Sequence, residues 1–190
     1  QVSSTNIRKA LSDGKPRDAA TMLGHWHRID GKVITGEQRG RELGYPTANQ
    51  DTTGLHQPKF GVYAVFVDVL TGPHAGAYQG AASIGVRPMF GENQPNCETF
   101  LFDFKGDLYG EHISVALVDF LRGEEKFDDL DALITQMDAD CAQARDILAK
   151  ACATLSTGLA SGQNSGRRCR SNPCPPKSGK RSVMTAASVA

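Results

Sequence analysis

The sequence lacks any long hydrophobic run. No stretch approaches the roughly 20 apolar residues that a membrane-spanning helix needs, and residues 1–5 have neither the basic start nor the apolar centre of a signal peptide. Cysteine is also scarce. The sequence has only 5 cysteines, and their odd number and irregular spacing argue against a disulfide framework. We therefore expect a cytoplasmic protein with no membrane partner.

Acidic residues are absent from the end of the chain. All 21 Asp and Glu residues precede Ala151, whereas the segment that follows contains Lys and Arg among many Ser, Gly and Pro residues. Such a composition cannot bury enough apolar surface to offset its ordering entropy. We expect residues 155–190 to form a disordered basic tail. The tail also lacks aromatic residues on which bases could stack, so nucleic acid is not the favoured partner.

Residues 24–120 show the pattern of short strands separated by turns. The expected strands, rich in β-branched and aromatic residues, are 26–34, 60–70, 78–86, 98–104 and 112–121. In the last of them Ile113, Val115 and Leu117 share one face. Several short strands joined by Gly and Pro turns predict a mainly β protein, a closed, Greek-key-like antiparallel barrel without exposed edges.

Helical patterns flank the expected barrel. Ser and Thr hydroxyls at residues 3–5 and a proline at position 16 predict two short helices within residues 3–23. Near the other end, Asp128 and Asp129 can cap a helix in which apolar residues recur at helical spacing from Leu130 to Leu148. We expect that helix to pack on the barrel and the whole domain to span residues 24–154.

The segment most suggestive of chemistry is residues 31–49. It contains four glycines at uneven intervals, and glycine allows backbone N–H groups to approach an anion closely. Arg41 adds positive charge, and Thr47 and Asn49 place two hard oxygens on one face of an extended segment. Mg²⁺ prefers such ligands. From the residues alone, a phosphate-binding loop and an ordinary glycine-rich hairpin loop both remain open.

The order of several motifs resembles the riboflavin kinase family. The first is Gly31-x-Val33-x-x-Gly36-x-x-x-Gly40-Arg41-x-Leu43-Gly44-x-Pro46-Thr47-Ala48-Asn49, which is similar to the family signature. Further similar blocks lie at residues 61–65, 80–88, 98–99, 103–104, 107–110 and 121–127. The resemblance covers residues 24–150 and includes the kinase half of bacterial bifunctional riboflavin kinase/FAD synthetases.

The resemblance implies phosphoryl transfer from ATP to riboflavin, giving FMN and ADP. In the family, the Thr and Asn that match Thr47 and Asn49 bind Mg²⁺ and the ATP phosphates. The catalytic carboxylate matches Glu98, at the start of an expected strand, where it would take the proton of a hydroxyl group. Gly36, Arg41 and Tyr109 are then expected at the nucleotide. Without the resemblance, Glu98 would be an ordinary surface carboxylate.

The same resemblance implies that Arg122, Glu125 and Phe127 lie near the flavin. Phe127 could stack on a flat ring, but it could equally pack the last helix onto the barrel. Arg122 could equally be a solvated charge in a turn. The sequence departs from the family at three positions, where Ser83, Met89 and Phe100 replace the usual Asn, Thr and His.

The first residues resemble a different domain. Val2-Ser3-Ser4-Thr5-Asn6-Ile7-Arg8 is similar to a motif that closes the adenylyltransferase domain of bifunctional FAD synthetases. We therefore interpret residues 1–23 as the end of such a domain, to which the kinase would normally be covalently joined. Because the sequence has no His-x-Gly-His motif, FMN adenylylation by this chain alone is not expected. A non-catalytic flavin-binding or nucleic-acid-binding barrel remains the alternative to a kinase.

Overall fold

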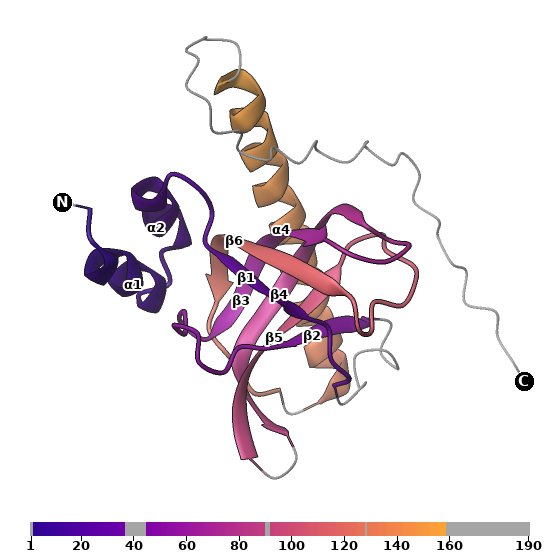
Figure 1. Ribbon diagram of the computed structural model, residues 1–190. Coiled ribbons are helices and arrows are strands. Elements are labelled where there is room, and N and C mark those ends of the chain that lie inside the picture. Colours follow the sequence, from indigo (N-terminus) through magenta and orange to yellow (C-terminus); the bar gives the residue numbers. More distant parts are fainter. Residues whose placement is uncertain (1, 37–44, 90–91, 128, 159–190) are drawn as a thin grey trace, which may run out of the picture.

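The computed structural model describes residues 2–36, 45–89, 92–127 and 129–158 (Figure 1). Within these ranges two short helices precede six strands and a long final helix. Their bounds are α1 (Ser4–Ser12), α2 (Pro16–Leu23), β1 (Arg28–Lys32), β2 (Thr47–Asp51), β3 (Gly61–Val69), β4 (Gly76–Met89), β5 (Glu92–Leu101), β6 (His112–Arg122) and α4 (Leu130–Gly158).

The six strands form one antiparallel sheet that curls into a nearly closed barrel. Their order is β1-β6-β3-β4-β5-β2, and every neighbouring pair is antiparallel. The two edge strands meet just past the end of β1, where the Ile34 N–H donates to the Asn49 carbonyl at 2.8 Å. Curling removes most of the exposed strand edge. The expected mainly β antiparallel barrel is confirmed.

The barrel interior is filled by alternate residues of each strand. On β6, Ile113, Val115 and Leu117 are fully buried in it, as their alternation predicted. The polar Gln50 of β2 also lies there: it is fully buried, and its Nε2 donates to the carbonyls of Ile29, Gly31 and Ile113 at 3.2–3.5 Å. These bonds join β2 to β1 and β6 across the place where the barrel closes.

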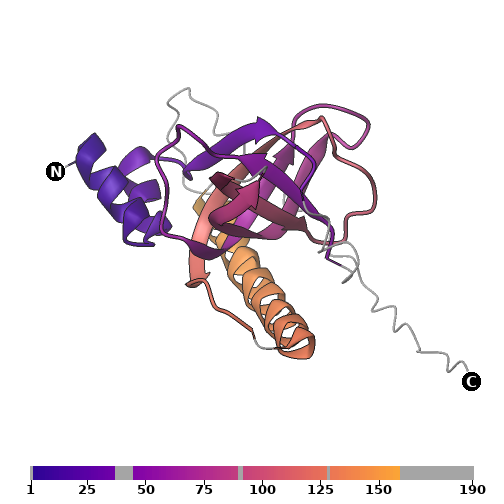
Figure 2. The same ribbon diagram turned by 90° about the horizontal axis from the view of Figure 1, so that it is seen from below.

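Helix α4 lies along the outside of the barrel (Figure 2). Its Ala144, Leu148 and Ala151 are buried against Ala64, Ala81 and Phe102, on the outer face of the sheet. The predicted cap is confirmed, because Asp129 Oδ1 accepts from the Ala132 N–H at 2.7 Å. The helix ends at Gly158, beyond the expected domain boundary at 154. The remaining tail, residues 159–190, lies outside the described residues.

The two N-terminal helices begin as the sequence predicts. The Ser3 hydroxyl caps α1 by accepting from the Asn6 N–H at 3.2 Å, and Pro16 occupies the first turn of α2. Arg17 of α2 donates to Asp119 of β6 at 2.8 Å, which fastens this helix pair to the barrel. Figure 1 shows both helices beside the sheet and away from α4.

Two strands differ most from their sequence-based expectation. Strand β2, Thr47–Asp51, was expected only as an extended segment, since its run of polar residues shows no alternation of apolar and polar side chains. Strand β5 begins at Glu92 rather than at residue 98. Glu98 therefore lies within a strand and not at its start, because the polar residues before it extend the β4–β5 hairpin.

Candidate functional site

The pairing of β2 with β5 places Asn49 directly opposite Glu98. Side chains of such directly paired residues project from the same face, with Cβ atoms about 4.5–5.5 Å apart. On the other side of Glu98, β4 presents Ser83 at the same level. The amide, the carboxylate and the hydroxyl thus form one polar row across three strands.

Glu98 points away from the barrel interior. Its neighbours Cys97 and Thr99 are fully buried inside, where their Sγ and Oγ1 atoms are 3.5 Å apart. Strand alternation therefore directs Glu98 to the outer face. There Asn96, two residues away on the same strand, donates from Nδ2 to Glu98 Oε1 at 3.2 Å. This bond restricts the orientation of the carboxylate.

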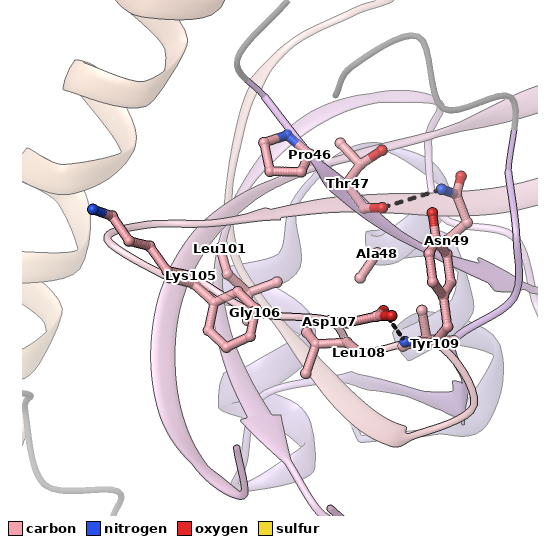
Figure 3. Close-up of a pocket in the computed structure, with 12 residues that line it drawn as sticks. Pro46, Thr47, Ala48, Asn49, Leu101, Lys105, Gly106, Asp107, Leu108 and Tyr109 are labelled. Carbon is pink, nitrogen blue, oxygen red and sulfur yellow. Dashed lines mark hydrogen bonds between the residues drawn. The ribbon is translucent and has the colours of Figure 1, made fainter. Parts of the chain in front are cut away.

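The Asn49 amide is fixed in place by two neighbours. Its Nδ2 donates to the Thr47 carbonyl at 3.3 Å (Figure 3), which leaves Oδ1 as the oxygen available to a ligand. Gly36 lies against the same amide, since a Cβ atom there would be 2.5 Å from Nδ2. No side chain fits in that space without displacing Asn49, so the glycine requirement at position 36 is steric.

A pocket of about 270 Å³ lies between β2 and the loop that follows β5 (Figure 3). Its size is close to the lower limit of about 300 Å³ for small-molecule sites. Of the predicted residues, Thr47, Asn49 and Tyr109 line it. The remaining lining residues are Val33, Pro46, Ala48, Leu101, Phe104, Lys105, Gly106, Asp107 and Leu108. The exposed Tyr109 ring gives this pocket an aromatic surface, whereas the Lys105 ammonium group points away from Thr47 and Asn49 (Figure 3).

The three residues predicted to contact flavin lie together at the end of β6. The Arg122 guanidinium lies over the Phe127 ring, 5.6 Å from its centre, and its Nη1 is 3.9 Å from Glu125 Oε2. Strand pairing places Arg122 opposite Val62 of β3, and Val62 opposite Ser83. Arg122 is therefore at the far end of the polar row that begins with Asn49 and Glu98.

Most of the predicted site residues thus fall into two adjoining groups. In the first group, Thr47, Asn49 and Tyr109 line the pocket, and Gly36 lies behind Asn49. In the second, Glu98 lies on the outer face at one end of the row, and Arg122, Glu125 and Phe127 lie at the other end. Arg41 lies outside the described residues.

Of the three departures from the family pattern, Ser83 adjoins Glu98. Phe100 packs edge-to-face against Tyr45, with ring centres 5.1 Å apart. The side chain of Met89 is outside the described residues.

Several residues of the site were not predicted. Asn96 could have been found from its spacing of two from Glu98 in a strand. Gln50 and Asp140, in contrast, are polar residues buried at 0% and 4% exposure, and only the tertiary structure shows what they contact. The residues next to Gln50 and Asp140 in the sequence do not indicate their burial, because the groups that bind their side chains come from distant parts of the chain.

Two perturbed groups near the site act as structural residues. Burial raises the pKa of the Cys97 thiol to about 11, with Thr99 opposing and the Glu98 charge adding to the shift. The thiol stays protonated near neutral pH, so Cys97 is no nucleophile despite its position beside Glu98. Burial, followed by the hydrogen bond to Asp138, also raises the pKa of Tyr45 well above its ordinary value.

The donor set at β2 suits a hard cation. Within the described parts of the chain, no three His, Cys, Asp or Glu side chains gather in a way that could hold a metal ion. Thr47 and Asn49 instead offer hydroxyl and amide oxygens beside the Glu98 carboxylate. Mg²⁺ fits such sparse oxygen ligands, because it keeps several waters and takes phosphate oxygens from a substrate.

The fold and these groups define a small antiparallel β-barrel enzyme with a polar pocket at the closure of the barrel. A family model, riboflavin kinase (flavokinase), matches residues 23–148. The chain belongs to the riboflavin kinase family. Across the described residues, no helix has both the length and the apolar character needed to span a membrane.

Known proteins similar to this chain support the same assignment. A bifunctional riboflavin kinase/FMN adenylyltransferase of Pseudomonas fluorescens is 40% identical over 150 residues, which are 78% of this chain and 47% of that protein. A riboflavin kinase structure from Trypanosoma brucei has a TM-score of 0.50 at 25% identity, covering 73% of this chain and 91% of that one.

A crystal structure of a macrolide-efflux protein from Streptococcus pneumoniae has a TM-score of 0.66 at 38% identity, covering 74% of this chain and 45% of that one. The chain spans about half the length of the curated relatives it matches.

Proposed function

We propose that this chain transfers the γ-phosphoryl group of ATP to the 5′-hydroxyl of riboflavin, giving FMN and ADP. The observation that carries the proposal is the register of β2 and β5, which pairs Asn49 with Glu98. A ligand oxygen for a phosphate-bound cation and a carboxylate able to accept a proton thereby lie side by side. Phosphoryl transfer to an alcohol uses both a positioned base and a cation at the phosphates.

Each group has a distinct role in the proposed reaction. Glu98, held by Asn96, accepts the proton of the ribityl 5′-hydroxyl. At the same time the 5′-oxygen of riboflavin bonds to the γ-phosphorus, and the bond from this phosphorus to ADP breaks. Thr47 and Asn49 would hold Mg²⁺, which neutralises the phosphate charge when bound. Tyr109 lines the nucleotide pocket, and Gly36 leaves the space that the Asn49 amide occupies. Arg41 is proposed to approach the phosphates.

The flavin is proposed to lie over the outer face between Glu98 and the end of β6. Val62 and Ser83 occupy the row between Glu98 and Arg122. Both side chains are short, so they leave room for a flat ring above the sheet. The Arg122 guanidinium, the Glu125 carboxylate and the Phe127 ring then contact the ring system. Phe127 is half-buried against Arg122, which leaves part of its surface available.

The longer relatives suggest the setting of this activity. They are bifunctional proteins in which a kinase is joined to an FMN adenylyltransferase, and this chain matches about half of their length. We propose that residues 1–23 are the end of such an adenylyltransferase domain. A cytoplasmic location is proposed with it, because the reaction consumes ATP.

The test is incubation of the purified chain with riboflavin and Mg-ATP, with FMN and ADP measured by chromatography. We expect FMN to form and its formation to stop with EDTA. Glu98→Gln should lower kcat by at least about 100-fold, the usual contribution of a positioned base. Asp13→Asn, at the exposed end of α1, removes a carboxylate far from the site and should leave kcat unchanged.

Near-normal turnover by Glu98→Gln would refute the assigned base. Riboflavin binding by the folded wild-type chain without any FMN formation would support the non-catalytic flavin-binding barrel instead. Binding to nucleic acid with a steep dependence on salt concentration would support a nucleic-acid-binding barrel.

A further inference from the structure

Helix α4 carries a carboxylate that is almost completely buried. Asp140 is 4% exposed, although aspartate rarely lies inside a protein unless it is paired. Its carboxylate accepts four hydrogen bonds. Arg122 Nε donates to both oxygens at 3.0 Å, Arg122 Nη2 donates to Oδ2 at 2.8 Å, and Gln136 Nε2 donates to Oδ1 at 2.9 Å. The carboxylate therefore has one orientation.

The same contacts fix the orientation of Arg122. A bidentate pair between a guanidinium and a carboxylate is planar and directional, unlike a pair of point charges. The edge of Arg122 that does not face Asp140 donates from Nη1 to the Gly123 carbonyl at 3.0 Å. Phe127 lies against the guanidinium face. One arginine thus links the helix to both ends of the segment 123–127.

A contribution to stability alone does not account for this arrangement. Replacing a buried ion pair by apolar side chains of similar volume is often neutral or stabilising, because two charges must leave water. Alanines and leucines already join α4 to the barrel. What Asp140 adds to these apolar contacts is a defined direction for the Arg122 side chain and for the chain that follows it.

We infer that Asp140 is a positioning residue for the flavin. From within α4 it holds Arg122 in the orientation that shapes residues 123–127, and Gln136 holds Asp140 in turn. This inference rests on the proposed function, in which Arg122, Glu125 and Phe127 contact riboflavin. It predicts that loss of the carboxylate weakens the use of riboflavin and leaves the use of ATP intact, since Tyr109, Thr47 and Asn49 do not contact Asp140.

The test is Asp140→Asn in the full chain, which keeps the volume and removes the charge. We expect KM for riboflavin to rise at least about tenfold, the effect of losing a charge-assisted hydrogen bond. KM for ATP should stay within about twofold of wild type. Asp140→Glu, which retains the charge but moves it by one methylene group, should recover part of the lost affinity. Riboflavin binding is measured independently by quenching of flavin fluorescence.

The matched control is Arg145→Gln, which breaks another arginine–aspartate pair on the same helix. Arg145 bonds to Asp103, at 2.9 and 3.2 Å, beside the nucleotide pocket. It should leave KM for riboflavin unchanged. Equal rises of both KM values in Asp140→Asn, or a lower melting temperature with both KM values unchanged, would overturn the inference.

A second variant covers the case in which Asp140→Asn does not fold. Gln136→Leu removes one donor to Asp140, keeps the ion pair and should raise KM for riboflavin in the same direction without changing KM for ATP. An unchanged KM for riboflavin in this folded variant would then overturn the inference. Absence of FMN formation by the wild-type chain would instead refute the proposed function, so the two failures are distinguishable.

Discussion

Single atoms decide whether the nucleotide side of the site can form. Gly36 and Asn49 come from different segments, yet the space between them admits no further carbon atom. A Cβ on Gly36 would lie 2.5, 2.7 and 2.9 Å from three atoms of the Asn49 amide. The glycine is required by this neighbour and not by backbone conformation, which distinguishes it from the turn glycines with positive φ.

Gly36→Ala should therefore displace the Asn49 amide from its position beside Thr47. We expect KM for ATP to rise by about tenfold or more, because a misplaced ligand group loses much of its contribution. Gly76→Ala is the control, since a Cβ there has no neighbour closer than 3.8 Å. Steady-state kinetics of both variants with ATP as the varied substrate measure the effect. Equal KM values for ATP in the two variants would contradict this steric role.

His27 makes folding sensitive to acid. Burial lowers the pKa of its imidazole below 6.5, the nearby His56 and His25 lower it further, and Asp30 partly opposes them. The folded state therefore resists protonation more than the unfolded state does. Stability should be highest above about pH 6.5 and fall as the pH drops through that value, because the unfolded chain then binds the proton more readily.

The melting temperature at pH 7.5 and at pH 5.5 measures this effect. His27→Gln should show a smaller fall between the two values than the wild-type chain, since it removes the titrating group. His74→Gln, which removes a histidine that packs on Phe104, serves as the comparison. An equal fall in all three proteins would exclude His27 as the cause.

Helix α4 attaches to three segments around the site. Asp138 accepts from the Tyr45 hydroxyl just before β2, Asp140 binds Arg122 at the end of β6, and Arg145 binds Asp103 after β5. Asp103 has a φ of 57°, in the left-handed region that residues other than glycine rarely adopt. Its carboxylate is held by the ion pair with Arg145. The helix thus acts as a common support for loops that are distant in sequence.

Arg145→Gln should loosen the loop after β5 and raise KM for ATP by about threefold, the modest effect expected of an exposed ion pair. The pair contributes little to global stability, so the melting temperature should stay close to that of wild type. Kinetics with ATP varied, together with thermal unfolding, check both statements. A large fall in melting temperature with KM for ATP unchanged would contradict them.

At the scale of the whole molecule, the pocket proposed to bind the nucleotide depends on barrel closure. The edges β1 and β2 approach each other through the Ile34–Asn49 bridge, and Gln50 extends across the interior to carbonyls on β1 and β6. Its Oε1 atom has no partner among the described residues. Asn49 and Gln50 are adjacent, so one strand places the amide proposed to bind the cation on the outer face and the amide that closes the barrel on the inner face.

Gln50→Ala should lower the free energy of unfolding by roughly 2–4 kcal/mol, as expected for a cavity and lost hydrogen bonds in a core. It should also raise KM for ATP, because β2 is held less firmly. Gln50→Leu refills the volume without the hydrogen bonds and should recover stability more than KM. Chemical denaturation and kinetics on both variants separate the two effects. Full recovery of both by leucine would show that only volume matters there.

The sequence predicted the elements better than their arrangement. Alternation in residues 112–121, the cap at Asp129 and the hydroxyl at Ser3 were sufficient for β6, α4 and α1. Strand β2 has no apolar alternation, so its place at the barrel edge is set by tertiary contacts such as those of Gln50. Thr47, Asn49 and Glu98 were predicted from the family resemblance, whereas their mutual register and the role of Asp140 depend on pairings distant in sequence.

The pairing of Asn49 with Glu98 also bears on how the chain avoids misfolding. If β2 or β5 slipped by one residue, every side chain of the slipped strand would change faces. A slipped β5 would turn Glu98 into the apolar interior, and burying an unpaired carboxylate is strongly unfavourable. The side chain proposed to accept the proton thus also disfavours the slipped barrel. Every correctly folded molecule therefore has this carboxylate on the outer face, where the substrate is proposed to bind.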